Sequence, residues 1–264
     1  IFKEFLYHSI RGTITIKSPV DSMPSLHKLF YSCLKVRNFQ YNRGGPGFRD
    51  ASEGLRINQS WQLQCLAGEQ YLHQLLNDHS LEALMDESGM NIIHYLLLGG
   101  HDDQAISLLK KHNHLIDSKD HYGRNLLHTA AFSGSLDAVE YAIERNTDLI
   151  DQKDNYDISV LHYAALSGSV DVIKYILIRN PKLSTAKDKK DRNYLHFAVM
   201  SGSVDAIEYI QDRDPNLVKS RIKNGVDFIH FAVKSGTLNT IIHILKKNPD
   251  LARRKSDDGD TILH

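Results

Sequence analysis

The sequence predicts an all-α solenoid of 34-residue helix-turn-helix units joined by hairpin loops, with a small N-terminal extension. Three series of residues that recur every 34 positions predict this fold class. Six of the 15 histidines form the first series: His94, His128, His162, His196, His230 and His264. Glycines form the second: Gly100, Gly134, Gly168, Gly202 and Gly236. Prolines form the third: Pro181, Pro215 and Pro249.

Each unit begins with a short helix that has a candidate N-cap three residues before its histidine. The side chains at this position can accept hydrogen bonds from the free N–H groups of a first helical turn. They are Asn91, Asn125, Ser159, Asn193, Asp227 and Thr261. Small residues inside the helix, such as Ala130 and Ala164, permit close helix packing, and we expect the repeated glycine to end the helix.

A second amphipathic helix follows the glycine, as in residues 136–143 and 170–177, where apolar residues recur at helical spacing. Asn-Pro or Asp-Pro ends this helix in three units. A polar segment such as 119–123 then leads into the next unit. We expect the proline-containing stretch to form a loop and the polar segment to form a hairpin.

Two stretches carry a resemblance to a known family. Asn-Leu-Leu-His-Thr-Ala at 125–130 and Ser-Val-Leu-His-Tyr-Ala at 159–164 resemble the ankyrin signature Thr-Pro-Leu-His-x-Ala. The resemblance extends over residues 86–264, although an apolar residue replaces the signature proline and the period is 34 rather than 33. It implies that the repeated histidine is a buried structural residue joining hairpin to helix. It also implies that partners contact the hairpin tips and the exposed face of each first helix.

The repeats divide the chain into two parts. Residues 1–56 form a non-repeat segment, in which Ser25 begins a predicted helix that runs to Asn38. Residues 57–264 form the solenoid, with 57–85 as a degenerate capping repeat and 86–264 as five full repeats plus the start of a sixth. Because the sequence stops four residues into that sixth repeat, we expect the protein to continue beyond it or to end in a disordered tail.

Composition excludes several classes of protein. The 264 residues are 41% hydrophobic and include 32 basic and 32 acidic side chains, a balance that argues against a nucleic-acid binder. Two cysteines exclude a disulfide scaffold and favour a reducing compartment, so we expect a cytoplasmic protein. No apolar run is long enough to span a membrane. We expect a monomer without cofactors.

Candidate chemistry is weak throughout the sequence. The six repeated histidines should lie about 10 Å apart in a stack, too far to share a metal ion. His112, His114 and His121 lack a further ligand at a known zinc spacing, and Cys33 falls on the apolar face of its predicted helix. No hydrolase, kinase or phosphate-loop signature occurs. The sequence therefore predicts no catalytic residue, no metal site and no enzyme.

The candidate partner-binding residues lie on two elements. Two residues before each repeated glycine, at the end of the first helix, stand Leu98, Phe132, Leu166, Met200 and Lys234. We expect the four apolar members to form an exposed stripe, which typically marks an interaction site. The adjoining hairpins add Tyr122, Arg124, Tyr156, Ile158 and Arg192. The alternative is that these side chains pack between helices or are covered by residues 1–56.

Two functions from different classes fit these observations. The first is a protein–protein interaction scaffold that binds a partner through its concave surface. The divergent repeats are also similar to ankyrin effectors that intracellular bacteria deliver into the host cytosol. The second is the substrate-recruiting part of a larger enzyme, whose catalytic region is residues 1–56 or lies outside this chain. A regulatory array attached to a membrane domain is a third possibility that the resemblance leaves open.

Overall fold

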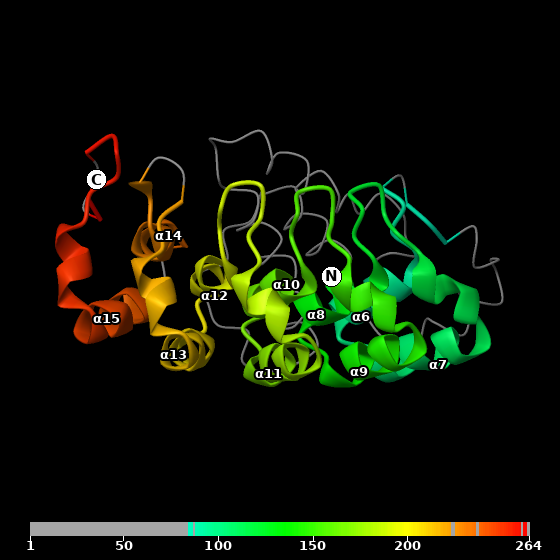
Figure 1. Ribbon diagram of the computed structural model, residues 1–264. Coiled ribbons are helices and arrows are strands. Elements are labelled where there is room, and N and C mark those ends of the chain that lie inside the picture. Colours follow the sequence, from blue (N-terminus) through cyan, green and yellow to red (C-terminus); the bar gives the residue numbers. More distant parts are fainter. Residues whose placement is uncertain (1–83, 87, 223–224, 236–237, 260, 263–264) are drawn as a thin grey trace, which may run out of the picture.

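The computed structural model describes residues 84–86, 88–222, 225–235, 238–259 and 261–262 (Figure 1). The predictions for residues 1–56, for most of the capping repeat and for His264 lie outside these residues. Within the described residues the secondary structure is helical, and β-structure is limited to isolated bridges at the base of the hairpins. The all-α fold class is confirmed.

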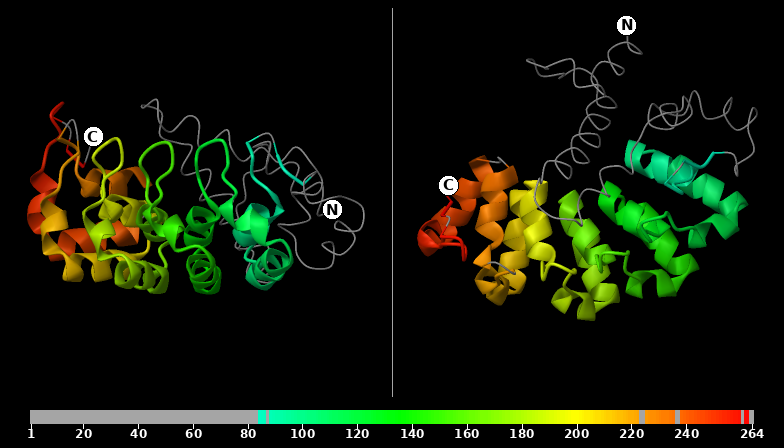
Figure 2. Two further views of the ribbon diagram at one scale, coloured as in Figure 1. Left: turned by 45° about the vertical axis from the view of Figure 1, so that its right-hand side comes forward. Right: turned by 90° about the horizontal axis from the view of Figure 1, so that it is seen from above.

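Ten α-helices in the described part of the chain form five pairs. They are α6 (Ile92–Gly99) with α7 (Asp102–Lys111), α8 (Leu126–Ser133) with α9 (Leu136–Arg145), α10 (Val160–Ser167) with α11 (Val170–Arg179), α12 (Tyr194–Ser201) with α13 (Val204–Arg213), and α14 (Phe228–Ser235) with α15 (Leu238–Lys247). The first helices of neighbouring units pack closely, whereas the second helices touch less. The solenoid consequently curves, with the first helices on the inner side of the arc (Figure 2).

The first helices begin and end where the sequence predicts. Asn125 caps α8, because its Oδ1 accepts from the His128 N–H at 3.0 Å and its own N–H donates to His128 Nδ1 at 3.1 Å. The glycines that follow α6, α8, α10 and α12 adopt the left-handed conformation. Gly168, for example, has a φ angle of 77°. A Cβ at Gly168 would also lie 2.7 Å from the Ser203 Cβ, so the next repeat requires glycine there as well.

The second helices are amphipathic, and three of them, α9, α11 and α13, are capped by the serine that follows the glycine. The hydroxyls of Ser135, Ser169 and Ser203 accept from backbone N–H groups at 3.2 to 3.4 Å. In the same three helices an aspartate in the first turn and an arginine in the last turn complement the helix dipole, as Asp171 and Arg179 do in α11. The inner face of α11 is fully buried.

The prediction that the proline-containing stretch is a loop is wrong. Five 3-10 helices occupy this position: η2 (Asn113–Asp117), η3 (Thr147–Asp151), η4 (Pro181–Thr185), η5 (Pro215–Lys219) and η7 (Pro249–Arg253). In η4, η5 and η7 proline stands at the first helical position, where no N–H is needed. The third residue, Leu149, Leu183 or Leu251, is buried and anchors the turn to the core.

Gln211 is an exception in the core of the fourth described repeat. Its side chain is 3% exposed, and neither of its amide atoms has a hydrogen-bond partner in the structure. The same repeat position holds buried Leu109, Ile143 and Leu177. Gln211→Leu should therefore raise the free energy of unfolding by about 1–3 kcal/mol, because it removes an unsatisfied buried amide.

Urea denaturation followed by circular dichroism measures this change. The half-exposed Gln104 of α7 provides the control, since Gln104→Leu should shift stability by less than about 0.5 kcal/mol. A destabilised Gln211→Leu protein would contradict the prediction.

Candidate protein-binding surface

The first four described hairpins form one continuous edge because each is hydrogen bonded to the next. Backbone N–H groups of His121, Asn155 and Lys189 donate to the carbonyls of Ser88, Tyr122 and Tyr156 at 2.8 to 3.1 Å. Side chains strengthen the same contacts, since Asn155 Nδ2 donates to the His121 carbonyl and Lys189 Nζ to the Asn155 carbonyl. Figure 1 shows these loops standing in register above the helices. These hydrogen bonds fix the distance between successive hairpins, so the edge is a pre-formed surface for a partner.

An aspartate organises each of the first four described hairpins; it is half-buried in the first and buried in the other three, and sequence reasoning missed it. In each hairpin its Oδ1 accepts two backbone N–H groups, as Asp188 does from Lys190 at 2.9 Å and Arg192 at 2.8 Å. The other oxygen accepts from a tyrosine or an arginine, such as Tyr163 on Asp154 at 2.8 Å. The available signal was a 34-residue spacing shared by Asp86, Asp120, Asp154 and Asp188.

The prediction that Ile158 and Arg192 are exposed binding residues is wrong. They are 4% and 3% exposed, respectively. Arg192 is ion-paired with Asp188, where its Nε donates to Oδ2 at 2.6 Å, and its guanidinium lies 4.8 Å from the centre of the Phe197 ring. Each of them directly precedes the N-cap residue of a first helix. At this point the chain leaves the hairpin and enters the core, so both side chains are buried.

Arg124 occupies the same repeat position but stays half-buried. Its Nε donates to Asp120 Oδ2 at 2.5 Å, and its guanidinium lies 5.1 Å from the centre of the Tyr122 ring. Tyr122 and Tyr156 are also half-buried. These three side chains remain part of the accessible hairpin edge.

The expected apolar stripe on the first helices is not continuous, and this expectation is corrected. Leu98 is 7% and Leu166 is 5% exposed, so both belong to the core. Phe132 and Met200 are half-buried and pack against that core. The side chain of Lys234 lies outside the described ones. The accessible apolar groups on the concave side are therefore Phe132 and Met200, together with Tyr122 and Tyr156 on the hairpins.

The repeated histidines lie inside the fold. His94, His128, His162 and His196 are fully buried, and His230 is half-buried. In each of the five, Nδ1 accepts the backbone N–H of the N-cap residue at 3.1 to 3.3 Å. His162 Nε2 donates to the Arg192 carbonyl at 3.2 Å, which joins this helix to the next hairpin.

Burial sets the protonation of these rings. Burial, together with a smaller contribution from the charge on Arg124, lowers the pKa of His94 and His128 to about 3. Burial also lowers the pKa of His162 and His196 to about 4. Three rings pack edge-on against an aromatic residue of the following repeat, as His162 does on Phe197 at 4.9 Å between ring centres. They are neutral groups that hold neighbouring repeats together.

Among the described side chains, no group of three or more His, Cys, Asp or Glu could hold a metal ion. No described helix is long and apolar enough to cross a bilayer. The described surface supplies hydrogen-bonding edges and half-buried aromatic rings, which suit recognition of another macromolecule.

Comparisons with known proteins found a family model and a solved structure that match this chain. The family model described as "Ankyrin repeats (many copies)" matches residues 127–177 and 161–211. Among solved structures, the crystal structure of the ankyrin repeat domain of Bcl-3, described as a unique member of the IkappaB protein family, matches with a TM-score of 0.48 and 18% identity. That match covers 78% of this chain and 93% of the other. No curated protein matches the sequence significantly.

Proposed function

The chain is an ankyrin-repeat protein, and from that premise we propose that it is a scaffold that binds a partner protein along its concave side. Ankyrin repeats are protein–protein interaction modules without chemistry of their own. The observation that carries the proposal is the hydrogen-bonded row of hairpins, which aligns Tyr122 and Tyr156 along one edge. Phe132 and Met200 add apolar groups from the first helices beside it. Rigid aromatic anchors on a pre-organised surface bind with little loss of conformational entropy.

A matched pair of double variants tests the concave surface. Tyr122→Ser with Met200→Ser removes two accessible groups from the hairpin edge and the first helices. Tyr175→Ser with Ile242→Ser makes comparable changes on the second helices α11 and α15. Proteins captured by the natural chain, identified by quantitative mass spectrometry and then purified, provide the ligand for titration calorimetry.

The concave variant should weaken binding at least about tenfold, as expected from the loss of more than 1 kcal/mol at an interface anchor. The control should bind like the natural chain, and both variants should keep the helical circular-dichroism spectrum. Equal binding by the concave variant and the natural chain would overturn the proposal.

The cytosol is the proposed place of action, and the host cytosol if the protein is a bacterial effector. Two cysteines in 264 residues support a reducing compartment, and the divergence of the repeats from the ankyrin signature supports the effector origin. Fusion to an enzyme reporter that acts only inside host cells tests delivery. The proposed monomeric state is tested by light scattering on the purified chain.

A further inference from the structure

A second feature of the surface is a change in charge along the solenoid. The seven residues that begin at each 3-10 helix align from repeat to repeat. The first two segments, 113–119 and 147–153, carry two Lys and three Asp, a net charge of 2 − 3 = −1. The next three, 181–187, 215–221 and 249–255, carry seven Lys or Arg and one Asp, a net charge of 7 − 1 = +6.

The charge change arises at particular repeat positions. Every segment ends in a basic residue, and all five are exposed: Lys119, Lys153, Lys187, Arg221 and Lys255. In the first two segments an aspartate stands two residues earlier, and Asp117 and Asp151 each accept a hydrogen bond from an asparagine of the next repeat at 2.6 Å. Thr185, Lys219 and Arg253 replace these aspartates in the last three segments. The basic residues that end the last three segments therefore have no aspartate two residues before them.

These exposed cations form one face, which we call the basic face. It consists of Lys182, Lys187, Lys219, Arg221, Arg253 and Lys255, all of them exposed. Neighbouring repeats are joined within it, because the Arg221 guanidinium donates to the Lys255 carbonyl and Arg254 Nη1 donates to the Val218 carbonyl at 3.3 Å. No ion pair is formed by its six members among the described residues, whereas Arg254 is paired with the buried Asp227 at 3.2 Å.

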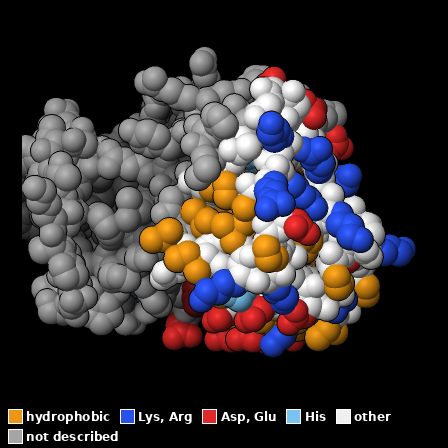
Figure 3. Space-filling model, turned by 90° about the vertical axis from the view of Figure 1, so that its left-hand side faces the viewer, with side chains coloured by type: hydrophobic (Ala, Val, Ile, Leu, Met, Phe, Trp, Pro, Cys, Tyr) orange, Lys and Arg blue, Asp and Glu red, His pale blue; other side chains and the backbone are white. Residues whose placement is uncertain are grey.

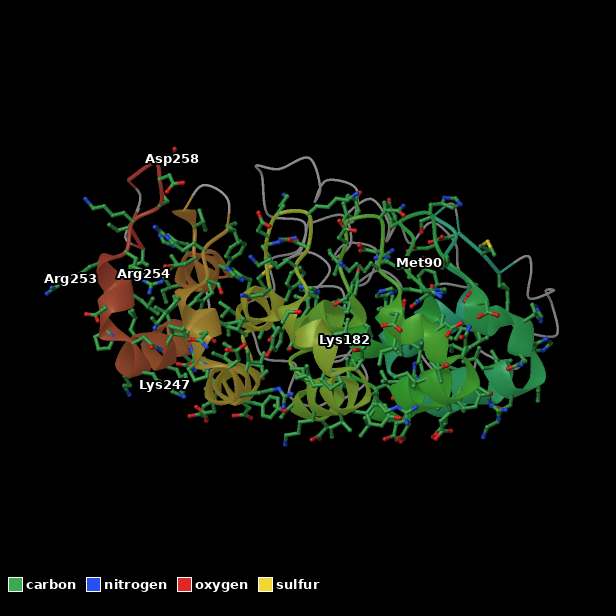
Figure 4. All side chains as sticks on the ribbon, viewed as in Figure 1. Met90, Lys182, Lys247, Arg253, Arg254 and Asp258 are labelled. Atoms are coloured by element: carbon green, nitrogen blue, oxygen red, sulfur yellow. The ribbon has the colours of Figure 1, made fainter. Side chains whose placement is uncertain are left out.

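The six members of the basic face lie in or just after η4, η5 and η7, which follow the second helices and not the first helices of the concave side. In Figure 3, Lys and Arg side chains gather over the upper and right-hand part of the described surface, whereas Asp and Glu gather along its lower edge. Figure 4 shows Lys182, Arg253 and Arg254 at the level of the 3-10 helices, with Lys247 lower, at the end of α15. The face thus follows η4, η5 and η7 along the last three described repeats.

An exposed apolar side chain lies close in sequence to the basic face. Ile178, at the end of α11 and four residues before Lys182, is 76% exposed. The same position in the other repeats holds charged residues: Lys110, Glu144, Asp212 and Lys246. An isoleucine at a position otherwise occupied by charged groups suits contact with an apolar group of a ligand.

We propose that the basic face binds an acidic polypeptide segment that carries an apolar residue, at a surface separate from the concave one. A row of cations at a regular repeat spacing complements the carboxylates of an extended acidic chain. The three segments contain no aromatic residue, and single-stranded nucleic acid is typically bound by stacking bases on such residues. One exposed isoleucine is too small an apolar surface for a bilayer, which requires a whole helix face.

The test uses a fluorescein-labelled 14-residue peptide of alternating Asp and Glu with one central Leu, titrated with the chain by fluorescence anisotropy at 50 mM NaCl. Lys219→Glu with Lys255→Glu reverses two cations of the basic face. Lys119→Glu with Lys153→Glu makes the same change in net charge on the first two repeats and is the matched control. Circular dichroism verifies that both variants are folded.

The basic-face variant should raise the Kd of the peptide at least about tenfold, and the control by less than about twofold. Ile178→Ser should weaken binding of the Leu peptide but not of the same peptide with Ser in place of Leu. Three outcomes would overturn the proposal: no binding of the Leu peptide, equal losses in the two charge variants, or tighter binding of a 14-nucleotide single strand or of phosphatidylserine vesicles than of the peptide.

Discussion

Lowering the pH from 7.5 to 5 should destabilise the repeats strongly. His94, His128, His162 and His196 are buried as neutral rings, with pKa values lowered by burial to about 3 or about 4. In the unfolded chain the same rings have a pKa of about 6.5. Between these values the unfolded state binds more protons than the folded state. The stability these histidines contribute is therefore fully present above pH 6.5 and is lost as the pH falls toward their folded pKa values.

The expected loss at pH 5 is about 2 kcal/mol per histidine, or about 8 kcal/mol for the four rings together. This is comparable to the whole free energy of unfolding of an ordinary domain. Urea denaturation followed by circular dichroism at pH 7.5, 6.5, 6.0 and 5.0 measures it. His162→Asn, although less stable at pH 7.5, should lose about 2 kcal/mol less on acidification. A pH-independent stability between 7.5 and 5 would contradict the assignment of neutral buried rings.

Asp188→Ala should destabilise the fold by about 3–5 kcal/mol, since it leaves the buried Arg192 guanidinium without its carboxylate. Asp188 is 5% exposed and also accepts the backbone N–H groups of Lys190 and Arg192, so the change opens the turn of the hairpin. Thermal and urea unfolding measure the loss.

The control is a solvent-exposed ion pair, in which a lysine takes the place of the arginine. Asp212 accepts from Lys247 Nζ at 2.5 Å, but its side chain is 67% exposed. Asp212→Ala should cost less than about 1 kcal/mol, because solvent screens an exposed pair. Similar losses for Asp188→Ala and Asp212→Ala would show that burial of Arg192 does not decide the strength of its pairing.

The boundaries of the first helices could be predicted from the sequence because the interactions that set them are local. An N-cap and the histidine three residues later meet within one turn, as Asn125 and His128 do, so spacing alone identifies the pair. A left-handed glycine such as Gly134 is likewise required by the backbone of its own helix end. The 34-residue period of these residues also predicted the number of units and the presence of two helices in each unit.

Exposure at the candidate site could not be predicted in the same way. Phe132 and Leu166 share a repeat position, yet the first is half-buried and the second is in the core. Arg124 and Arg192 also share a position, and the second is almost completely covered. Burial at such a position depends on the side chains of the neighbouring repeats, which the period alone does not describe.

The sequence by itself determined the 34-residue unit, its two helices and the caps of the first helices, and its resemblance to the ankyrin family implied the structural role of the histidines. Only the tertiary structure decided that the proline-containing stretch is helical, that Leu98, Ile158, Leu166 and Arg192 face inward, and that six cations of the last three described repeats share one exposed face. Interactions within a turn of helix depend on residues three or four apart, so they leave a pattern in the sequence. Packing between stacked repeats joins residues about 34 positions apart, and the size and charge of each pair decide which side chain remains in water.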